Sequence, residues 1–136
     1  MDTKPLASVR DLVKHFPIRS GWGIRPSGYV HAVNNINFDI FKGETLGLVG
    51  ESGSGKSTTG QLLLGLLTPT SGKISFLGQE INAFNSKKMR EIRKNIQVIF
   101  QDPYASLDPR MSIAQIIGEA LDTAGIKNKS ARLERI

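Results

Sequence analysis

The sequence predicts an α/β fold, and three consecutive features of the chain support this prediction. Residues 30–41 alternate apolar side chains, at Ile36, Phe38 and Ile40, with polar ones, as a strand with one solvated face does. Residues 45–49 are a short apolar run of the kind found in buried strands, and they lead directly into a glycine-rich segment. A helix with a run of leucines comes next. The order strand, loop and helix is that of an α/β protein.

Turn residues place the other elements of the first half. Pro17 is predicted to end a strand over residues 7–16, because proline lacks the N–H that a central strand donates. Gly78 closes a further predicted strand over residues 74–77. The charged stretch 86–94 is predicted to be a polar helix.

The second half is predicted to contain one more strand and then helices. Residues 96–100 form another apolar run, and the segment 101–110 that follows contains two prolines, which exclude regular structure. Ser112 opens a helix, and Gln115 is placed to complete a capping box with it. Gly125 is placed to end this helix.

Composition excludes several classes of protein. The 136 residues are enough for one compact domain, and the absence of cysteine excludes a disulfide framework, a thiolate zinc site and a cysteine nucleophile. The chain shows no leader sequence and no stretch of about 18 apolar residues, so we expect no membrane span. The formal net charge is +6, and its densest run lies on the predicted helix 86–94. We interpret this run as a solvated helix face and expect no nucleic-acid partner.

Residues 50–57 form a GxxxxGK pattern followed by serine, between a predicted strand and a predicted helix. We call them the glycine-rich loop. Glycines let consecutive backbone N–H groups point inward as an anion nest, and the following helix adds its N-terminal amides. Lys56 supplies a charge to the outer phosphates, Ser57 offers a hydroxyl to Mg²⁺, and Thr58 reaches the inner phosphate. The implied ligand is ATP with Mg²⁺, although the loop alone does not specify which nucleotide. Its predicted contacts are Gly50, Glu51, Ser52, Gly53, Ser54, Gly55, Lys56, Ser57 and Thr58.

Gln101 is a second candidate site residue. It follows the apolar run 96–100, so it lies at the carboxyl end of a predicted strand, where α/β sheets bind nucleotides. Its amide can reach a metal ion or a water molecule.

Three stretches resemble one protein family: HAVNNINFDIFKGETLGLVGESGSGKST, TPTSGKISFLGQEI and IQVIFQDPYASLDPRM. They are similar to the ATP-binding subunits of ABC transporters, in the oligopeptide, dipeptide and nickel permease group of bacterial importers. The resemblance covers most of the chain and implies an ABC-type nucleotide-binding domain of the P-loop NTPase class. It implies that residues 1–101 are the nucleotide-binding core with its antiparallel β-subdomain. Residues 102–136 would continue from the Q-loop into the start of a helical subdomain.

The resemblance assigns roles to individual residues. It makes the glycine-rich loop the Walker A motif and Gln101 the Q-loop glutamine, so that Lys56 and Gln101 act in catalysis. Ser57 and Gln101 would bind the metal ion. Phe16 matches the aromatic that stacks on adenine, although Tyr29 or His31 could do the same.

The resemblance also implies partners. These are a second ATPase subunit, identical or different, and transmembrane permease subunits, at the cytoplasmic face of the bacterial inner membrane. Tyr104, Leu107 and Met111 lie where the family's membrane subunits insert a coupling helix, although packing inside the helical subdomain explains them equally well.

The sequence departs from the family pattern in its second half. It contains no LSGGQ-like signature, no Walker B strand ending in paired acids, and no later switch histidine, since His15 and His31 precede the loop. A last helix is predicted to begin near Ser130 and to be cut at Ile136, so we expect a truncated chain. We expect the complete protein to hydrolyse ATP to energise peptide import, and this chain alone to bind nucleotide weakly without turnover.

Two other interpretations remain open. A different P-loop enzyme, such as a GTPase or a small-molecule kinase, needs its own recognition motif, and residues 126–129 (IKNK) lack the aspartate of a guanine box. A non-transport ABC protein or a nucleic-acid binder is the other, and salt-sensitive DNA affinity would support it.

Overall fold

The computed structural model describes residues 4–19, 26–81, 86–102 and 107–136. The chain divides into two compact units, Met1–Gln97 and Val98–Ile136. In the described parts of the chain, no helix has both the length and the apolar character needed to cross a membrane.

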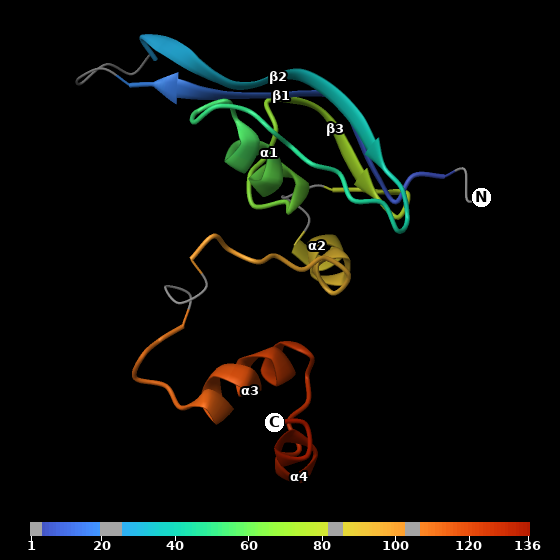
Figure 1. Ribbon diagram of the computed structural model, residues 1–136, viewed down its shortest axis with the longest axis vertical. Coiled ribbons are helices and arrows are strands. Elements are labelled where there is room, and N and C mark those ends of the chain that lie inside the picture. Colours follow the sequence, from blue (N-terminus) through green and yellow to red (C-terminus); the bar gives the residue numbers. More distant parts are fainter. Residues whose placement is uncertain (1–3, 20–25, 82–85, 103–106) are drawn as a thin grey trace. The chain divides into compact units, whose positions relative to one another are not determined.

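A four-stranded antiparallel sheet dominates the first unit (Figure 1). Its strands are β1 (Ala7–Ile18), β2 (Gly28–Ile40), β3 (Ser71–Phe76) and β4 (Gln79–Glu80), in the spatial order β2-β1-β3-β4. The α/β class predicted from the sequence is therefore confirmed, with antiparallel strands at its centre.

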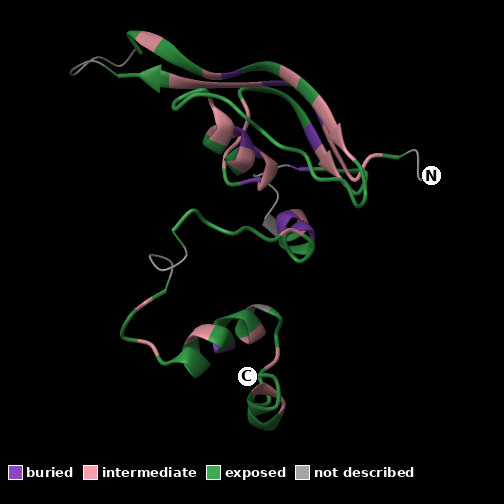
Figure 2. Cartoon of the chain, viewed as in Figure 1, coloured by how far each residue is buried: buried purple, intermediate pink, exposed green. Residues whose placement is uncertain are grey.

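Two helices complete the first unit, α1 (Lys56–Leu63) and α2 (Ser86–Arg93). One core joins them to the sheet: Leu62 of α1 and Met89 of α2 are both buried with the inward side chains of β1, β2 and β3 (Figure 2). The predicted polar helix over 86–94 is confirmed, because its charged face lies in solvent while Met89 and Ile92 enter the core. The buried apolar residues are Val9, Leu12, Val33, Leu62, Ile74, Ile81, Met89 and Ile92.

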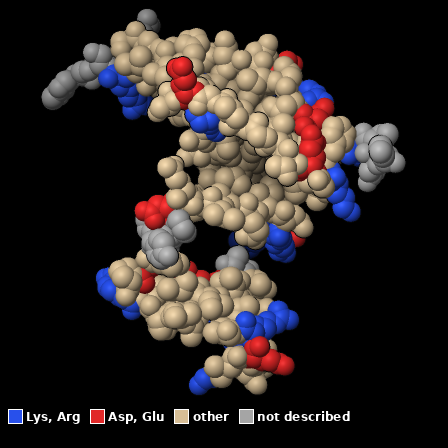
Figure 3. Space-filling model, viewed as in Figure 1, with Lys and Arg blue, Asp and Glu red and all other residues tan. Residues whose placement is uncertain are grey.

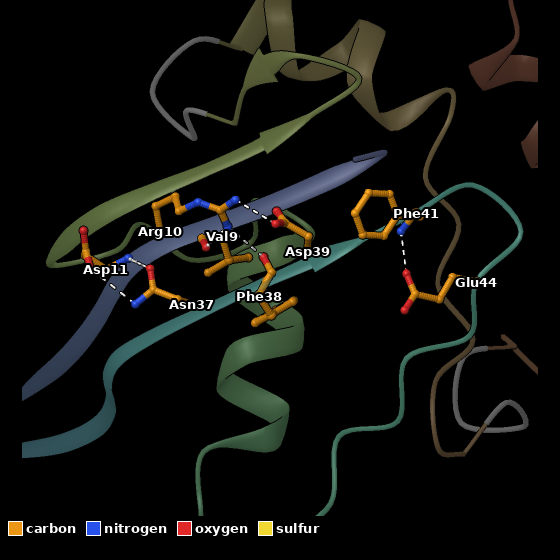
Figure 4. Close-up of polar contacts among 8 residues, drawn as sticks. All are labelled: Val9, Arg10, Asp11, Asn37, Phe38, Asp39, Phe41 and Glu44. Carbon is orange, nitrogen blue, oxygen red and sulfur yellow. Dashed lines mark hydrogen bonds and ion pairs between the residues drawn. The ribbon is translucent and has the colours of Figure 1, made fainter. Parts of the chain in front are cut away.

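The register of the long β1–β2 ladder is irregular, and Figure 4 shows the polar contacts beside one of its shifts. Asp11 has a φ of 48°, and its backbone N–H donates to Asn37 Oδ1 at 2.9 Å while Asn37 Nδ2 donates to Asp11 Oδ1 at 3.3 Å. Beside this bulge, Arg10 and Asp39 form an ion pair of 2.7 Å across the two strands. The side chains of Asp11 and Asn37 thus replace ladder bonds that the bulge removes.

The prediction that Pro17 ends the first strand is wrong. β1 continues to Ile18, and Pro17 lies opposite Tyr29 of β2. The pairing of β1 with β3 ends at Val13, so beyond that residue β1 has a partner strand on one side only. A proline is tolerated there because its missing N–H interrupts no ladder.

The predicted buried strands over 45–49 and 96–100 are also wrong for this structure. Both segments are irregular, and Val49 and Ile99 are 94% and 91% exposed. Buried parallel strands require neighbours on their edges and covered faces. Among the described residues no strand pairs with either segment, so apolar sequence alone does not make a strand here.

The second unit contains α3 (Ile113–Thr123) and α4 (Lys129–Leu133). The predicted capping box is present: the Gln115 backbone N–H donates to Ser112 Oγ, and Gln115 Oε1 accepts from the Ser112 backbone N–H at 2.7 Å. Gly125 has a φ of 78° just after α3, as its predicted role at the helix end requires. The last helix ends at Leu133, before Ile136.

Basic side chains do not gather on the visible face of the first unit (Figure 3). Lysines and arginines lie there in separate groups, with acidic side chains between them. This arrangement is consistent with reading the net charge as solvated surface.

Candidate functional site

The glycine-rich loop is shaped by glycines with backbone angles that other residues avoid. Gly53 and Gly55 have φ angles of 81° and 91°, and the Ser54 backbone N–H donates to Glu51 O at 3.2 Å. A Cβ atom on Gly55 would lie 2.1 Å from the backbone oxygen of Ala32, so β2 touches the loop at this point. A Cβ atom on Gly53 would have nothing within 4 Å among the described residues, so the space beside this residue is open.

The glycine-rich loop leads directly into α1, and no side chain among the described residues caps the first backbone N–H groups of this helix. Gly55 is the N-cap residue and supplies no side-chain acceptor. The first N–H groups of a helix have no intrahelical partner, so those of Lys56, Ser57 and Thr58 face the loop as hydrogen-bond donors. The positive end of the helix dipole lies at the same place.

Lys56 folds back over the loop that precedes it. Its Nζ donates to Gly50 O at 2.7 Å and to Glu51 O at 2.6 Å, and Ser54 Oγ lies 3.4 Å away. The ammonium group therefore stands at the centre of the loop, surrounded by oxygen acceptors. A cation and several N–H donors in one concave segment favour binding of a polyanion.

Thr59 supports the glycine-rich loop and is not among the residues predicted from the sequence. It is 4% exposed, and both its backbone N–H (2.8 Å) and its hydroxyl (3.0 Å) donate to Gly55 O. These bonds fix the point where the loop becomes helix. A threonine four residues after the last loop glycine is the signal that could have identified it, since threonine hydroxyls commonly donate to the carbonyl four residues earlier.

A cavity of about 300 Å³ adjoins the loop. His31, Ala32 and Val33 of β2 line it together with Ser54, Gly55 and Lys56. It lies entirely within the first unit and is large enough for part of a nucleotide.

The three aromatic candidates for an adenine contact differ in position. His31 lines the cavity beside the loop, whereas Phe16 and Tyr29, both described, do not. Phe16 lies opposite Val30 with the Lys14 ammonium 5.0 Å from its ring centroid. Tyr29 is 54% exposed. The assignment of Phe16 stays a prediction.

The remaining predicted site residues lie in the second unit. Gln101 is exposed in an irregular segment of Val98–Ile136, and its roles in catalysis and metal binding stay predictions. Leu107 is 45% exposed and Met111 is half-buried, which leaves both explanations of these residues open. Tyr104 lies outside the described residues.

Comparison with known proteins gives matches along the whole chain. A family model described as ABC transporter matches residues 33–136. The glutathione import ATP-binding protein GsiA of Salmonella typhimurium strain LT2 is 49% identical over 136 residues, covering 100% of this chain and 22% of GsiA. GsiA of Escherichia coli K12 is 50% identical over 143 aligned positions, covering 100% of this chain and 23% of that protein. The chain thus spans less than a quarter of these relatives.

Solved structures show the same fold. The ATP-binding cassette MJ0796, in a dimeric post-hydrolysis state bound to ADP and Pi, is 22% identical with a TM-score of 0.74. The match covers 95% of this chain and 53% of that one. The protein cbiO1 from Clostridium perfringens, part of the ABC transporter complex cbiONQ, is 26% identical with a TM-score of 0.57, and the match covers 90% of this chain and 51% of cbiO1.

Proposed function

Because the chain belongs to the ABC transporter family, we propose that its glycine-rich loop binds the phosphates of ATP and that it forms part of a subunit energising import. The observation that carries this proposal is the position of Lys56. Its ammonium lies within hydrogen-bond distance of Gly50 O and Glu51 O, directly before the uncapped N-terminus of α1. Lys56 is not one of the residues of the hydrophobic core, so packing does not explain a charged side chain here.

The geometry of Lys56 leaves capacity for a phosphate. An ammonium group has three N–H donors, and two of them make the short bonds to Gly50 O and Glu51 O. The third faces Ser54 Oγ at 3.4 Å, near the limit of a hydrogen bond. A phosphate oxygen can replace this weak contact at little cost while the two carbonyls hold the ammonium in place.

The N-terminus of α1 adds to this attraction. Each favourable charge at a helix N-terminus contributes about 0.3–1 kcal/mol when exposed. The amides are rigidly placed because Thr59 bonds to Gly55 O twice. A preformed donor set costs little ordering entropy on binding.

Ser57 is the residue we propose as a ligand of Mg²⁺. It is exposed on the first turn of α1, next to Lys56, and a hydroxyl oxygen suits a hard cation. When bound, Mg²⁺ would offset the charge of the phosphates. We propose that Gln101, which belongs to the second unit, contacts the metal ion and a water molecule, because it resembles the Q-loop glutamine.

The transport role rests on the relatives. GsiA is named as an ATP-binding protein for glutathione import, and glutathione is a small peptide. We propose that the protein to which this chain corresponds powers the import of peptide cargo. Its proposed partners are a second ATPase subunit, since MJ0796 is dimeric, and permease subunits that hold it at the cytoplasmic face of the membrane.

The test is nucleotide binding by the chain and by two lysine variants. Lys56→Ala removes the loop ammonium, and Lys87→Ala removes an exposed lysine of α2 as the matched control. We expect calorimetry with Mg²⁺-ATP to give heat for the chain and for Lys87→Ala and none for Lys56→Ala. Equal affinities of all three proteins would refute the assignment, and a preference for GTP would favour a different P-loop enzyme.

A further inference from the structure

We propose that His15 and His31 form a bidentate site for a late first-row divalent cation such as Zn²⁺. The chain contains two histidines in 136 residues, and these two are direct cross-strand partners on β1 and β2. Their ring centroids lie 3.9 Å apart with an interplanar angle of 47°. His31 is also an alternative for the adenine contact, but the family resemblance gives no role to the two histidines as a pair.

One ring nitrogen of His15 is free to bind a metal ion. Its Nε2 atom is buried and has no hydrogen-bond partner among the residues that the structure describes. A buried polar atom without a partner is uncommon and destabilises the folded state. A metal ion bound to this nitrogen would remove that destabilisation. His31 is exposed, so the ion could keep water molecules in its remaining positions.

The spacing of the two rings suits chelation. Directly opposed residues of an antiparallel pair have Cβ atoms about 4.5–5.5 Å apart. With Zn–N distances of about 2.0–2.1 Å and tetrahedral angles, the two nitrogen ligands of one ion lie roughly 3.3 Å from each other. Rings already separated by 3.9 Å can reach this arrangement by rotating about their side-chain bonds, with the backbone in place.

The ligand set determines which metal the proposed site prefers. In the described part of the chain, no cluster of three or more His, Cys, Asp or Glu residues could hold an ion, so the site is proposed with the two imidazoles as its side-chain ligands. A site with two imidazoles and water prefers Zn²⁺ or Cu²⁺ over Mg²⁺ or Ca²⁺, which require oxygen ligands. The ammonium group of the adjacent residue Lys14 donates to Thr68 O at 2.7 Å and lies 5.0 Å from the centroid of the Phe16 ring.

Metal binding at this site would link β1 to β2 at a point where their register is irregular. The β1–β2 register shifts between Lys14 and His15, so a bridge across His15 and His31 would fix the two strands just where the ladder is interrupted. Because the bridge requires the folded register, the ion should bind the folded chain and stabilise it.

The experiment is calorimetric titration of the nucleotide-free chain with Zn²⁺, followed by thermal unfolding with and without the ion. The variants are His15→Gln, His31→Gln and the double variant, and Asn34→Gln, an exposed residue of β2, is the control. We expect one Zn²⁺ per chain, a rise in Tm for the chain and for Asn34→Gln, and loss of both effects in either histidine variant. X-ray absorption of the Zn²⁺ adduct should show two imidazole ligands, which decides the question even if a variant does not fold.

Three results would overturn the proposal. The first is absence of Zn²⁺ binding to the folded chain. The second is equal binding by the double variant, which would mean an adventitious ion only. The third is binding that persists when urea unfolds the chain, because the site depends on the cross-strand register.

Discussion

Replacing Gly55 with alanine tests the contact between β2 and the glycine-rich loop. The change has two costs. A φ of 91° is unfavourable for alanine by about 1–2 kcal/mol, and the new Cβ would lie 2.1 Å from Ala32 O, where backbone must move. Overpacking of this kind costs about 1–3 kcal/mol, so we expect a total loss of about 2–5 kcal/mol in the free energy of unfolding.

Gly53→Ala is the matched variant for this test. Gly53 has a similar φ of 81° but nothing within 4 Å of its Cβ position, so only the conformational cost of about 1–2 kcal/mol applies. Gly43→Ala repeats that cost at a turn outside the loop, because Gly43 has a φ of 78° and equally open surroundings. The difference between Gly55→Ala and the other two variants isolates the packing of β2 on the loop.

The assay is urea unfolding, with the midpoint and the slope determined for each variant. At a typical slope of about 1–3 kcal/mol per molar urea, the extra loss of Gly55→Ala gives a clearly lower midpoint at an unchanged slope. Nucleotide affinity adds a second comparison, since Gly53→Ala should weaken it while Gly43→Ala should not. Equal midpoints for all three variants would refute the packing argument.

Two further predictions concern single hydrogen bonds and ion pairs. Thr59→Val removes the hydroxyl bond to Gly55 O and should cost about 0.5–1.5 kcal/mol of unfolding free energy, which Thr59→Ser should largely restore in urea unfolding. Hydrogen bonding from Arg132 lowers the pKa of Asp122, so this pair contributes stability above the carboxyl's unfolded pKa, and the contribution is lost as pH falls through the lower folded value. Thermal unfolding between neutral and acidic pH should therefore be less pH-dependent in Asp122→Asn, and an unchanged profile would contradict the role of the pair.

Local features of the fold could be predicted from the sequence because they depend on neighbouring residues. The capping box of Ser112 and Gln115 is formed within one helical turn, and the left-handed angle of Gly125 follows from its place after a helix. The glycine-rich loop belongs to the same class. Its glycines, its lysine and the helix after it are consecutive in the chain.

The features that could not be predicted depend on distant residues. Whether 45–49 and 96–100 become strands depends on neighbouring strands, and among the described residues none pairs with them. The continuation of β1 through Pro17 depends on where its pairing with β3 stops. The pairing of His15 with His31 depends on a register shift at Lys14, and no local pattern of residues specifies such a shift.

The most direct test of the proposal that the glycine-rich loop binds ATP is an NMR titration with Mg²⁺-ATP. It records which backbone amides change their chemical shifts. We expect the largest chemical-shift changes at the amides of residues 53–58, with smaller changes at His31 and Ala32, which adjoin the loop. Inorganic triphosphate should change the chemical shifts of the same loop amides. Binding of ATP by the loop would be contradicted if the amide chemical shifts of residues 53–58 did not change, or if the changes fell mainly on the basic helix α2.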